Sequence, residues 1–196
     1  MKYLATALAL LFSFNAYASE PETFESQVEM TPWSDKVAVF TNGRVKSFET
    51  FARSFMPHIM GPRKFEKQSP TFTYFDMLIR PERYMGESII FVKHKGLRAA
   101  IIGELNTNEP SVKERADIFM KTGLVSREIL QRAKVRSLLG RLRQDVRRFA
   151  APVETIDNAI GASDPRNLWA VLKVIPPKSG LFDEKWTTLD GVTDSA

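Results

Sequence analysis

The sequence predicts a mainly helical α+β fold, in which a short β-hairpin or small sheet packs among several helices. Three observations predict it. Apolar residues recur at three- and four-residue spacing in several segments, which is the period of an amphipathic helix. Ser, Pro and Gly stand at the ends of these segments, where helices are capped. One Asn-Gly pair separates two short strand-like runs, and 196 residues suffice for one domain with a substantial core.

Residues 1–18 have the pattern of a cleavable signal peptide. Lys2 precedes a predominantly apolar run of eleven residues, and Ala16 and Ala18 place small residues where a signal peptidase cleaves. The apolar run is too short to cross a bilayer, which takes about 20 residues. We therefore expect export to a bacterial periplasm and a mature chain that begins at Ser19 with a formal charge of +4.

The mature chain is expected to form an arm, one domain and a tail. Residues 19–34 are polar and acidic and contain prolines, which predicts an extended arm. A single globular domain is expected over residues 35–191, and residues 192–196 are expected to form a flexible tail.

The first elements of the domain follow from turn and capping signals. Asn42-Gly43 predicts a hairpin, because both residue types tolerate a positive φ. Ser47 is a suitable N-cap for an amphipathic helix over residues 48–59, which Pro57 is expected to kink or shorten.

The middle of the chain combines helices with one strand. A helix is expected over residues 71–79, although its Thr and aromatic residues also favour strands. Pro81 suits the first turn of a short helix. Residues 88–93 are the best strand candidate of the chain, and residues 97–102 are read as a short helix or strand.

Capping signals also define the later helices. A helix is expected over residues 110–122, closed by Gly123. Ser126 is expected to cap a longer helix that runs from residue 127 to about 149, and residues 152–166 are read as a loop or a short helix.

The predicted long helix holds most of the positive charge. Residues 127–148 contain eight basic and two acidic side chains, a net charge of +6, so the rest of the mature chain sums to about −2. Such a run is usually a solvated helix face, but it also suits docking to anionic lipid head groups or an acidic partner. Arginine predominates over lysine there, which favours bidentate contacts to carboxylates or phosphates. Nucleic acid is not expected as a partner, because the chain is exported.

Composition limits the chemistry that the chain can perform. It has no cysteine, which excludes a disulfide, a thiolate metal site and a thiol redox pair within the chain. With His58 and His94 as its only histidines, it cannot form a three-histidine metal site. It carries no HExxH, GxSxG, Walker or GxGxxG motif. We expect a non-enzymatic protein without a cofactor; a periplasmic hydrolase that uses a carboxylate or one histidine is the alternative.

His58 offers a further alternative, which is haem binding. It lies between Met56 and Met60, and histidine with methionine forms a soft ligand set for haem or copper. The interpretation that we favour is structural, with both methionines in the core and His58 near a helix end, because Pro57 disturbs the local geometry.

Three segments together resemble a known family. Residues 42–53 (NGRVKSFETFAR) resemble a GGRVKPLDTFAR-type motif, and Arg80-Pro81-Glu82-Arg83-Tyr84 with the strand and Leu-Arg pair after it resembles a second. Residues 172–177 with 185–189 resemble the ending. These motifs occur in periplasmic regions that accompany System II cytochrome c biogenesis proteins, which handle haem at the membrane. The chain lacks the membrane part and the Trp-rich haem-handling loop of these relatives.

The resemblance implies a periplasmic accessory domain that docks onto a membrane protein of cytochrome c assembly. The surface that it suggests comprises the hairpin tip and the turn at residues 81–83, to which we add the basic helix as a possible contact with an anionic membrane surface. The candidate partner-binding residues are Gly43, Arg44, Arg53, Pro81, Glu82, Arg132, Arg136, Arg143 and Arg147. Arg44 and Arg53 are also candidates for internal pairs with Glu49 or Glu82.

Overall fold

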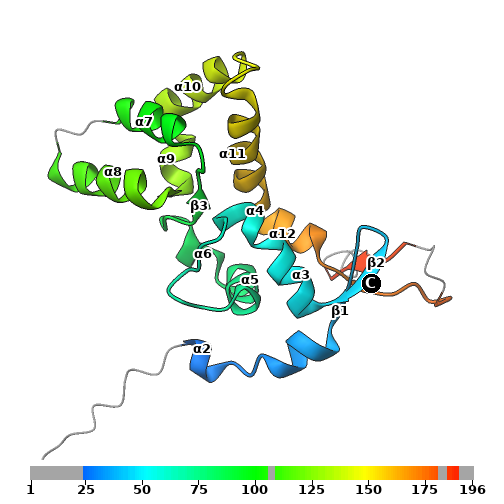
Figure 1. Ribbon diagram of the computed structural model, residues 1–196. Helices are drawn as coiled ribbons and strands as arrows, with labels where there is room; N and C mark the ends of the chain where they lie inside the picture. The colour runs from blue at the N-terminus through cyan, green and yellow to red at the C-terminus, as the bar shows by residue number, and fades with distance from the viewer. Residues whose placement is uncertain (1–23, 106–108, 181–184, 190–196) are drawn as a thin grey trace, which may run out of the picture.

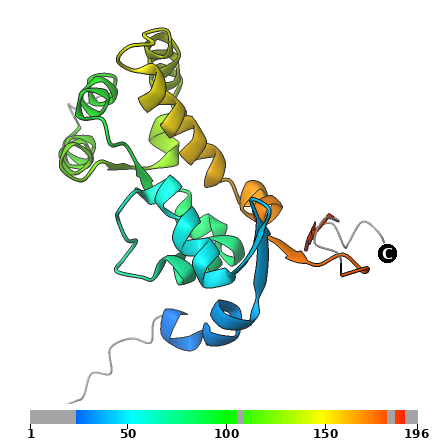
Figure 2. The ribbon, with the colours of Figure 1, turned by 45° about the vertical axis from the view of Figure 1, so that its right-hand side comes forward.

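The computed structural model describes residues 24–105, 109–180 and 185–189, and it confirms the mainly helical α+β class. Figure 1 shows the helices in two groups. α7 to α11 form the upper group, while the N-terminal elements, α3, α5, α6 and α12 form the lower one, and Figure 2 shows the same division after rotation. The predicted signal peptide and the tail lie outside the described residues.

The described part of the N-terminal arm is helical rather than extended. It forms α2 (Phe24–Gln27) and a short π-helix, η1 (Pro32–Lys36). The ring of Trp33 lies 5.0 Å from that of Phe75 and 5.8 Å from that of Phe48, measured between centroids. The expectation of an extended arm was therefore wrong for residues 24–27 and 32–36, because the contacts of the partly buried Trp33 with two core rings favour ordering of this polar segment.

The hairpin prediction is confirmed. β1 (Ala38–Thr41) pairs antiparallel with β2 (Arg44–Ser47), with Thr41 opposite Arg44. Asn42 and Gly43 both have positive φ, 49° and 72°, as a tight two-residue turn requires. The hairpin therefore closes at the residues that the sequence indicates.

The helix that follows is divided by its proline, as predicted. α3 (Phe48–Phe55) begins at Ser47, whose hydroxyl accepts a hydrogen bond of 3.3 Å from the backbone N–H of Thr50. α4 (Pro57–Met60) begins at Pro57, which occupies the first helical position. α3 packs against α5, and α4 packs against α11, so this pair of helices joins the two groups.

The expected helices at residues 71–79 and 81–84 are both present. α5 (Pro70–Ile79) is capped by the hydroxyl of Ser69, and α6 (Pro81–Tyr84) follows directly. Nearly every side chain of α5 is buried, which explains the aromatic residues that made its type ambiguous in the sequence.

The best strand candidate is much shorter than predicted. β3 (Ile90–Phe91) pairs with β4 (Leu124–Val125) over two residues. Arg98, which is buried, donates a hydrogen bond from its Nε to the carbonyl oxygen of Val92 at 2.6 Å. This carbonyl is therefore bonded to a side chain rather than to the backbone of a neighbouring strand. α7 (Lys95–Gly103) then begins, capped by His94.

α8 (Pro110–Thr122) has the predicted range and ends at Gly123, which adopts the left-handed conformation with φ of 80°. Its first helical position is Pro110, whose fixed φ suits that place.

The predicted helix over residues 127–149 was wrong. The chain forms α9 (Arg127–Gln131), capped by Ser126, and then α10 (Ala133–Arg143), because Arg132 is extended with ψ of 137°. This break lets the buried side chains of α10 pack against α11. α11 (Ala150–Ala162) occupies most of the segment that was predicted as a loop or a short helix, since Val153, Ile156 and Ala159 make one buried face.

The C-terminal segment packs on the hairpin. α12 (Pro165–Val171) leads into β5 (Lys173–Ile175), which pairs with β6 (Thr187–Thr188) and lies against β1. Trp186 stacks on Phe40 with ring centroids 5.5 Å apart. One cluster of buried apolar side chains extends from Val39 to Leu172 through both groups of helices. Among the described residues, no helix is both long and apolar enough to cross a bilayer.

A completely buried carboxylate joins α5 to α6. Asp76 has an exposed fraction of 0% and accepts hydrogen bonds from Arg80 Nε at 2.5 Å, Arg83 Nη1 at 3.1 Å and Tyr84 Oη at 2.7 Å. Burial and the bond to Asp76 raise the pKa of Tyr84, so its hydroxyl stays a donor. Arg83 also pairs with Glu66, and the guanidinium of Arg80 lies over the ring of Phe24, 3.6 Å from its centroid. We call these groups the Asp76 cluster.

Replacing Asp76 with Asn is expected to lower the free energy of unfolding by about 3 kcal/mol, because two partly buried guanidiniums lose their common carboxylate. Urea unfolding followed by circular dichroism measures the change. Asp117→Asn on α8 is the control, since that aspartate is exposed. Equal stability of the two variants would contradict a structural role for the cluster.

Candidate functional site

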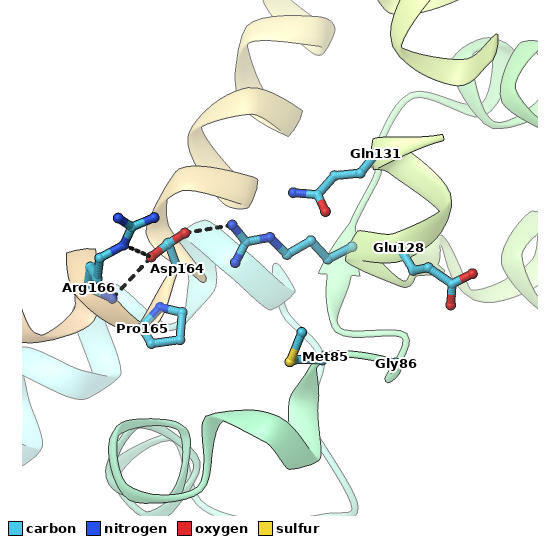
Figure 3. Close-up of a pocket in the computed structure, with 8 residues that line it drawn as sticks. Met85, Gly86, Glu128, Gln131, Asp164, Pro165 and Arg166 are labelled. Atoms are coloured by element: carbon cyan, nitrogen blue, oxygen red, sulfur yellow. Dashed lines mark hydrogen bonds and ion pairs between the residues drawn. The ribbon is translucent and has the colours of Figure 1, made fainter. Parts of the chain in front are cut away.

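Two adjoining cavities form a groove between the α9–α10 segment and the α11–α12 segment. One has a volume of about 570 Å³ and the other of about 710 Å³, and Gln131 lines both. Figure 3 shows the first cavity, where Gln131 and Glu128 come from one wall, Asp164, Pro165 and Arg166 from another, and Met85 from the end of α6. We call the two cavities together the arginine groove. It is lined by Arg127, Arg136, Arg143 and Arg166.

An ion pair closes the floor of the first cavity. Arg127 Nη2 lies 2.7 Å from Asp164 Oδ2, across 37 residues of sequence. Asp164 is also the N-cap of α12, since its Oδ1 accepts from the backbone N–H of Arg166 at 3.1 Å. The hydrogen bond from Arg127 holds the pKa of Asp164 below its ordinary value. Asp164 thus fixes the start of α12 and the guanidinium of Arg127 at once.

The remaining groups around the first cavity differ in their exposure to solvent and in their orientation. The Arg166 side chain is 93% exposed, with its Nε 3.6 Å from Asp164, so most of its guanidinium faces solvent. Met85 is 68% exposed and adds an apolar wall. In Figure 3 the amide of Gln131 points into the space between the walls, whereas the carboxylate of Glu128 points away from Asp164. The cavity therefore combines cationic donors, an amide and apolar surface.

The second cavity is the more polar of the two. Arg143 of α10 pairs with Asp157 of α11, which ties the two helices together across it. Arg136 lines the same cavity and is exposed, and the described side chains include no ion-pair partner for it. Each guanidinium has five N–H donors, so even the paired arginines keep donors for a ligand.

Charges along the arginine groove nearly balance. Four arginines stand against three acids, Glu128, Asp157 and Asp164, so the lining carries +1. Acids outside residues 127–148 neutralise part of the six-charge excess of that segment in the fold. Arg127 pairs with Asp164, Arg143 with Asp157, and Arg141 with Glu104 at 3.3 Å. The arginine groove therefore presents guanidinium N–H donors in defined directions rather than a large positive electrostatic potential.

The structure does not bring the nine predicted partner-binding residues together on one surface. Arg136 and Arg143 line the arginine groove, whereas Arg132 lies at the break between α9 and α10, and Arg147 is exposed in the turn after α10. A single basic face over residues 127–148 was therefore a wrong expectation, because the chain turns twice within that range.

Of the other predicted residues, Pro81 borders this groove, because it lines a small cavity together with Met85, Arg127 and Pro165, whereas the rest do not line the groove. Gly43 and Arg44 are at the hairpin tip, and Arg53 pairs with Glu49 at 3.2 Å, one of the predicted internal pairs. Pro81 and Glu82 begin α6. Figures 1 and 2 both place the β1–β2 hairpin far from α10, so hairpin tip and basic segment do not form one surface.

Neither histidine gathers a ligand set or an acid. His58 is exposed, while Met56 and Met60 are buried in the core, so the structure does not bring them together as haem ligands. His94 is half-buried, and its Nδ1 accepts from the backbone N–H of Leu97. Within the described ranges, no three His, Cys, Asp or Glu side chains lie close enough to hold a metal ion.

Sequence reasoning missed most of the first cavity. Arg127 stood within the basic run but was not singled out, and Gln131, Asp164 and Arg166 were not candidates. The pair Asp164-Pro165 is a helix start, an N-cap followed by Pro at the first position, and this signal could have located α12. The contact between Asp164 and Arg127 had no such local signal.

No family model, curated protein or solved structure matches the chain.

The Arg127–Asp164 pair predicts a pH-dependent contribution to stability. Because the folded pKa of Asp164 is depressed, the pair stabilises the fold above the ordinary aspartate pKa of about 3.9, and this contribution disappears as the pH falls below it. Asp164→Asn keeps an N-cap but loses the charge. We expect it to be about 1 kcal/mol less stable than the wild type at pH 7, with the gap closing toward pH 3.

Urea unfolding across this pH range measures the gap, with Asp117→Asn as the exposed control. A gap that stays constant down to pH 3 would show that the carboxylate charge contributes nothing.

Proposed function

We propose that this chain is a non-enzymatic periplasmic accessory protein of a cytochrome c assembly complex, and that it docks onto a haem-handling membrane protein through the arginine groove. The single observation that carries the docking proposal is the pair of exposed guanidiniums, Arg136 and Arg166, on walls that internal ion pairs hold in place. Firmly ion-paired arginines beside largely exposed ones suit recognition of a surface rather than turnover of a substrate.

The chemistry of the groove favours acidic side chains of a protein partner. A guanidinium binds a carboxylate through two parallel hydrogen bonds, and arginine is enriched in the centres of interfaces. Met85 and Pro165 provide apolar contact beside these donors. Arginine with exposed apolar surface is the usual composition of a protein interface, whereas contact with lipid head groups depends on an extended field of charge.

The place of action and the assembly complex come from the sequence. The signal-peptide pattern at residues 1–18 supports export, and the motif at residues 42–53 supports an association with cytochrome c biogenesis. In the fold, these motif residues build the tight turn and cap α3. The residues that carry the resemblance therefore support the fold itself, and the arginine groove is the surface that we propose this fold presents to a partner.

Affinity purification of the full-length protein from detergent-solubilised membranes tests the proposal. The double variant Arg136→Glu with Arg166→Glu reverses both exposed charges. Arg166→Glu loses the 3.6 Å ion pair with Asp164, while it places an acid in the first turn of α12, where acids are favoured. We expect the variant to recover at least about tenfold less of the haem-handling membrane protein than the wild type, an effect of about 1.4 kcal/mol.

The matched control is Lys113→Glu with Arg115→Glu on the exposed face of α8, which makes the same change in net charge. This control should recover the partner normally. Equal losses in both variants would point to attraction by net charge or to an anionic membrane surface, and recovery of cell-wall or outer-membrane components alone would refute the assembly role.

A further inference from the structure

We propose that an apolar cavity at the start of α11 binds a small amphipathic carboxylate, with an unbranched hydrocarbon chain inside and the head group at Lys93 and His94. The cavity has a volume of about 470 Å³, within the range of small-molecule sites. Phe91, Val92, Pro152 and Ile156 supply its apolar lining. This binding activity is additional to the proposed docking function and does not depend on it.

The Phe91 wall of this cavity is held rigidly. A Cβ atom added at Gly61 would lie 2.3 Å from Phe91, and one added at Gly123 would lie 2.9 Å from it, so the ring packs where only glycine leaves room. Both glycines have positive φ, 58° and 80°. Close packing against the two glycine backbones therefore fixes one side of the Phe91 ring.

Arg98 fixes the neighbouring strand end. This buried arginine donates to the carbonyl oxygens of Val92 at 2.6 Å, Lys93 at 3.4 Å and Met120 at 3.0 Å. The burial of its guanidinium lowers the pKa of Arg98. The segment from Val92 to His94 is thus anchored from behind, which makes the cavity preformed.

His94 is oriented as a hydrogen-bond donor. Its Nδ1 accepts from the backbone N–H of Leu97 at 3.1 Å, so in the neutral ring the proton resides on Nε2. Phe149 packs edge-on against the imidazole with centroids 5.2 Å apart, which holds the ring orientation. Nε2 is therefore the ring nitrogen that remains available to a ligand, and as an N–H donor it is complementary to a carboxylate oxygen.

Charge complementarity defines the head group. Lys93 is an exposed cation on the rim next to His94, and no acid is present among the described residues that line the cavity. The hydroxyl of Thr155 already donates to the carbonyl oxygen of Ala151 at 2.9 Å. One cation and one ring N–H against an apolar interior select an anion with a hydrocarbon chain over a cation with the same chain.

Isothermal titration calorimetry of the full-length protein tests this with two probes of equal chain length, decanoate and decyltrimethylammonium, below their micelle concentrations. We expect decanoate to bind, and decyltrimethylammonium to bind about tenfold more weakly. Equal affinity for the two probes, or no binding of decanoate, would overturn the proposal.

Two variants test whether decanoate binds in this cavity. Ala151→Trp fills the cavity from its exposed rim and should abolish decanoate binding, whereas Ala99→Trp, on an exposed position of α7, should not. His94→Asp keeps an effective N-cap for α7 but carries a negative charge, so it should reverse the preference between the probes. Thermal unfolding by circular dichroism verifies that each variant folds. Normal decanoate binding by folded Ala151→Trp would refute the location.

Discussion

The carboxylate of Asp76 is completely buried, and an ionised group in that position must be satisfied by charged or hydrogen-bonding partners. Three of its partners lie within the next eight residues, so α6 can take only the position that brings Arg80, Arg83 and Tyr84 back to it. This constraint extends outward. Arg80 lies over Phe24 of the N-terminal arm, and α6 is followed directly by Met85, which forms one wall of the arginine groove. The shape of the candidate site thus depends on a buried charge that is not part of it.

The arginines of this protein have three different structural roles. Arg80, Arg83 and Arg98 are partly or fully buried and satisfy a carboxylate or backbone carbonyls, while Arg127 and Arg143 form ion pairs between helices. Arg136 and Arg166 remain exposed. A basic composition is therefore a poor guide to a docking surface by itself, because most of the guanidiniums stabilise the fold. The exposed arginines beside the ion-paired ones are the better indication of a partner, because the walls of the arginine groove that hold them are already ordered before binding.

Local signals in the sequence predicted local structure well. The turn at Asn42-Gly43, the cap at Ser47 and the helix closure at Gly123 each depend on residues within one turn of the chain. The failures share a tertiary cause. Arg132 breaks a continuous helical pattern so that α10 can pack on α11, and Trp33 draws a polar arm into helical turns. The arginine groove could not be predicted, because Arg127 and Asp164 meet across 37 residues of sequence.

The proposed docking surface is the arginine groove rather than the hairpin tip. Hydrogen–deuterium exchange of the protein, free and bound to its solubilised membrane complex, distinguishes these two surfaces. We expect slower exchange on binding in peptides from α9, α10 and the start of α12, with no change in the β1–β2 hairpin. Protection confined to the β1–β2 hairpin, with unchanged exchange along the arginine groove, would refute this assignment.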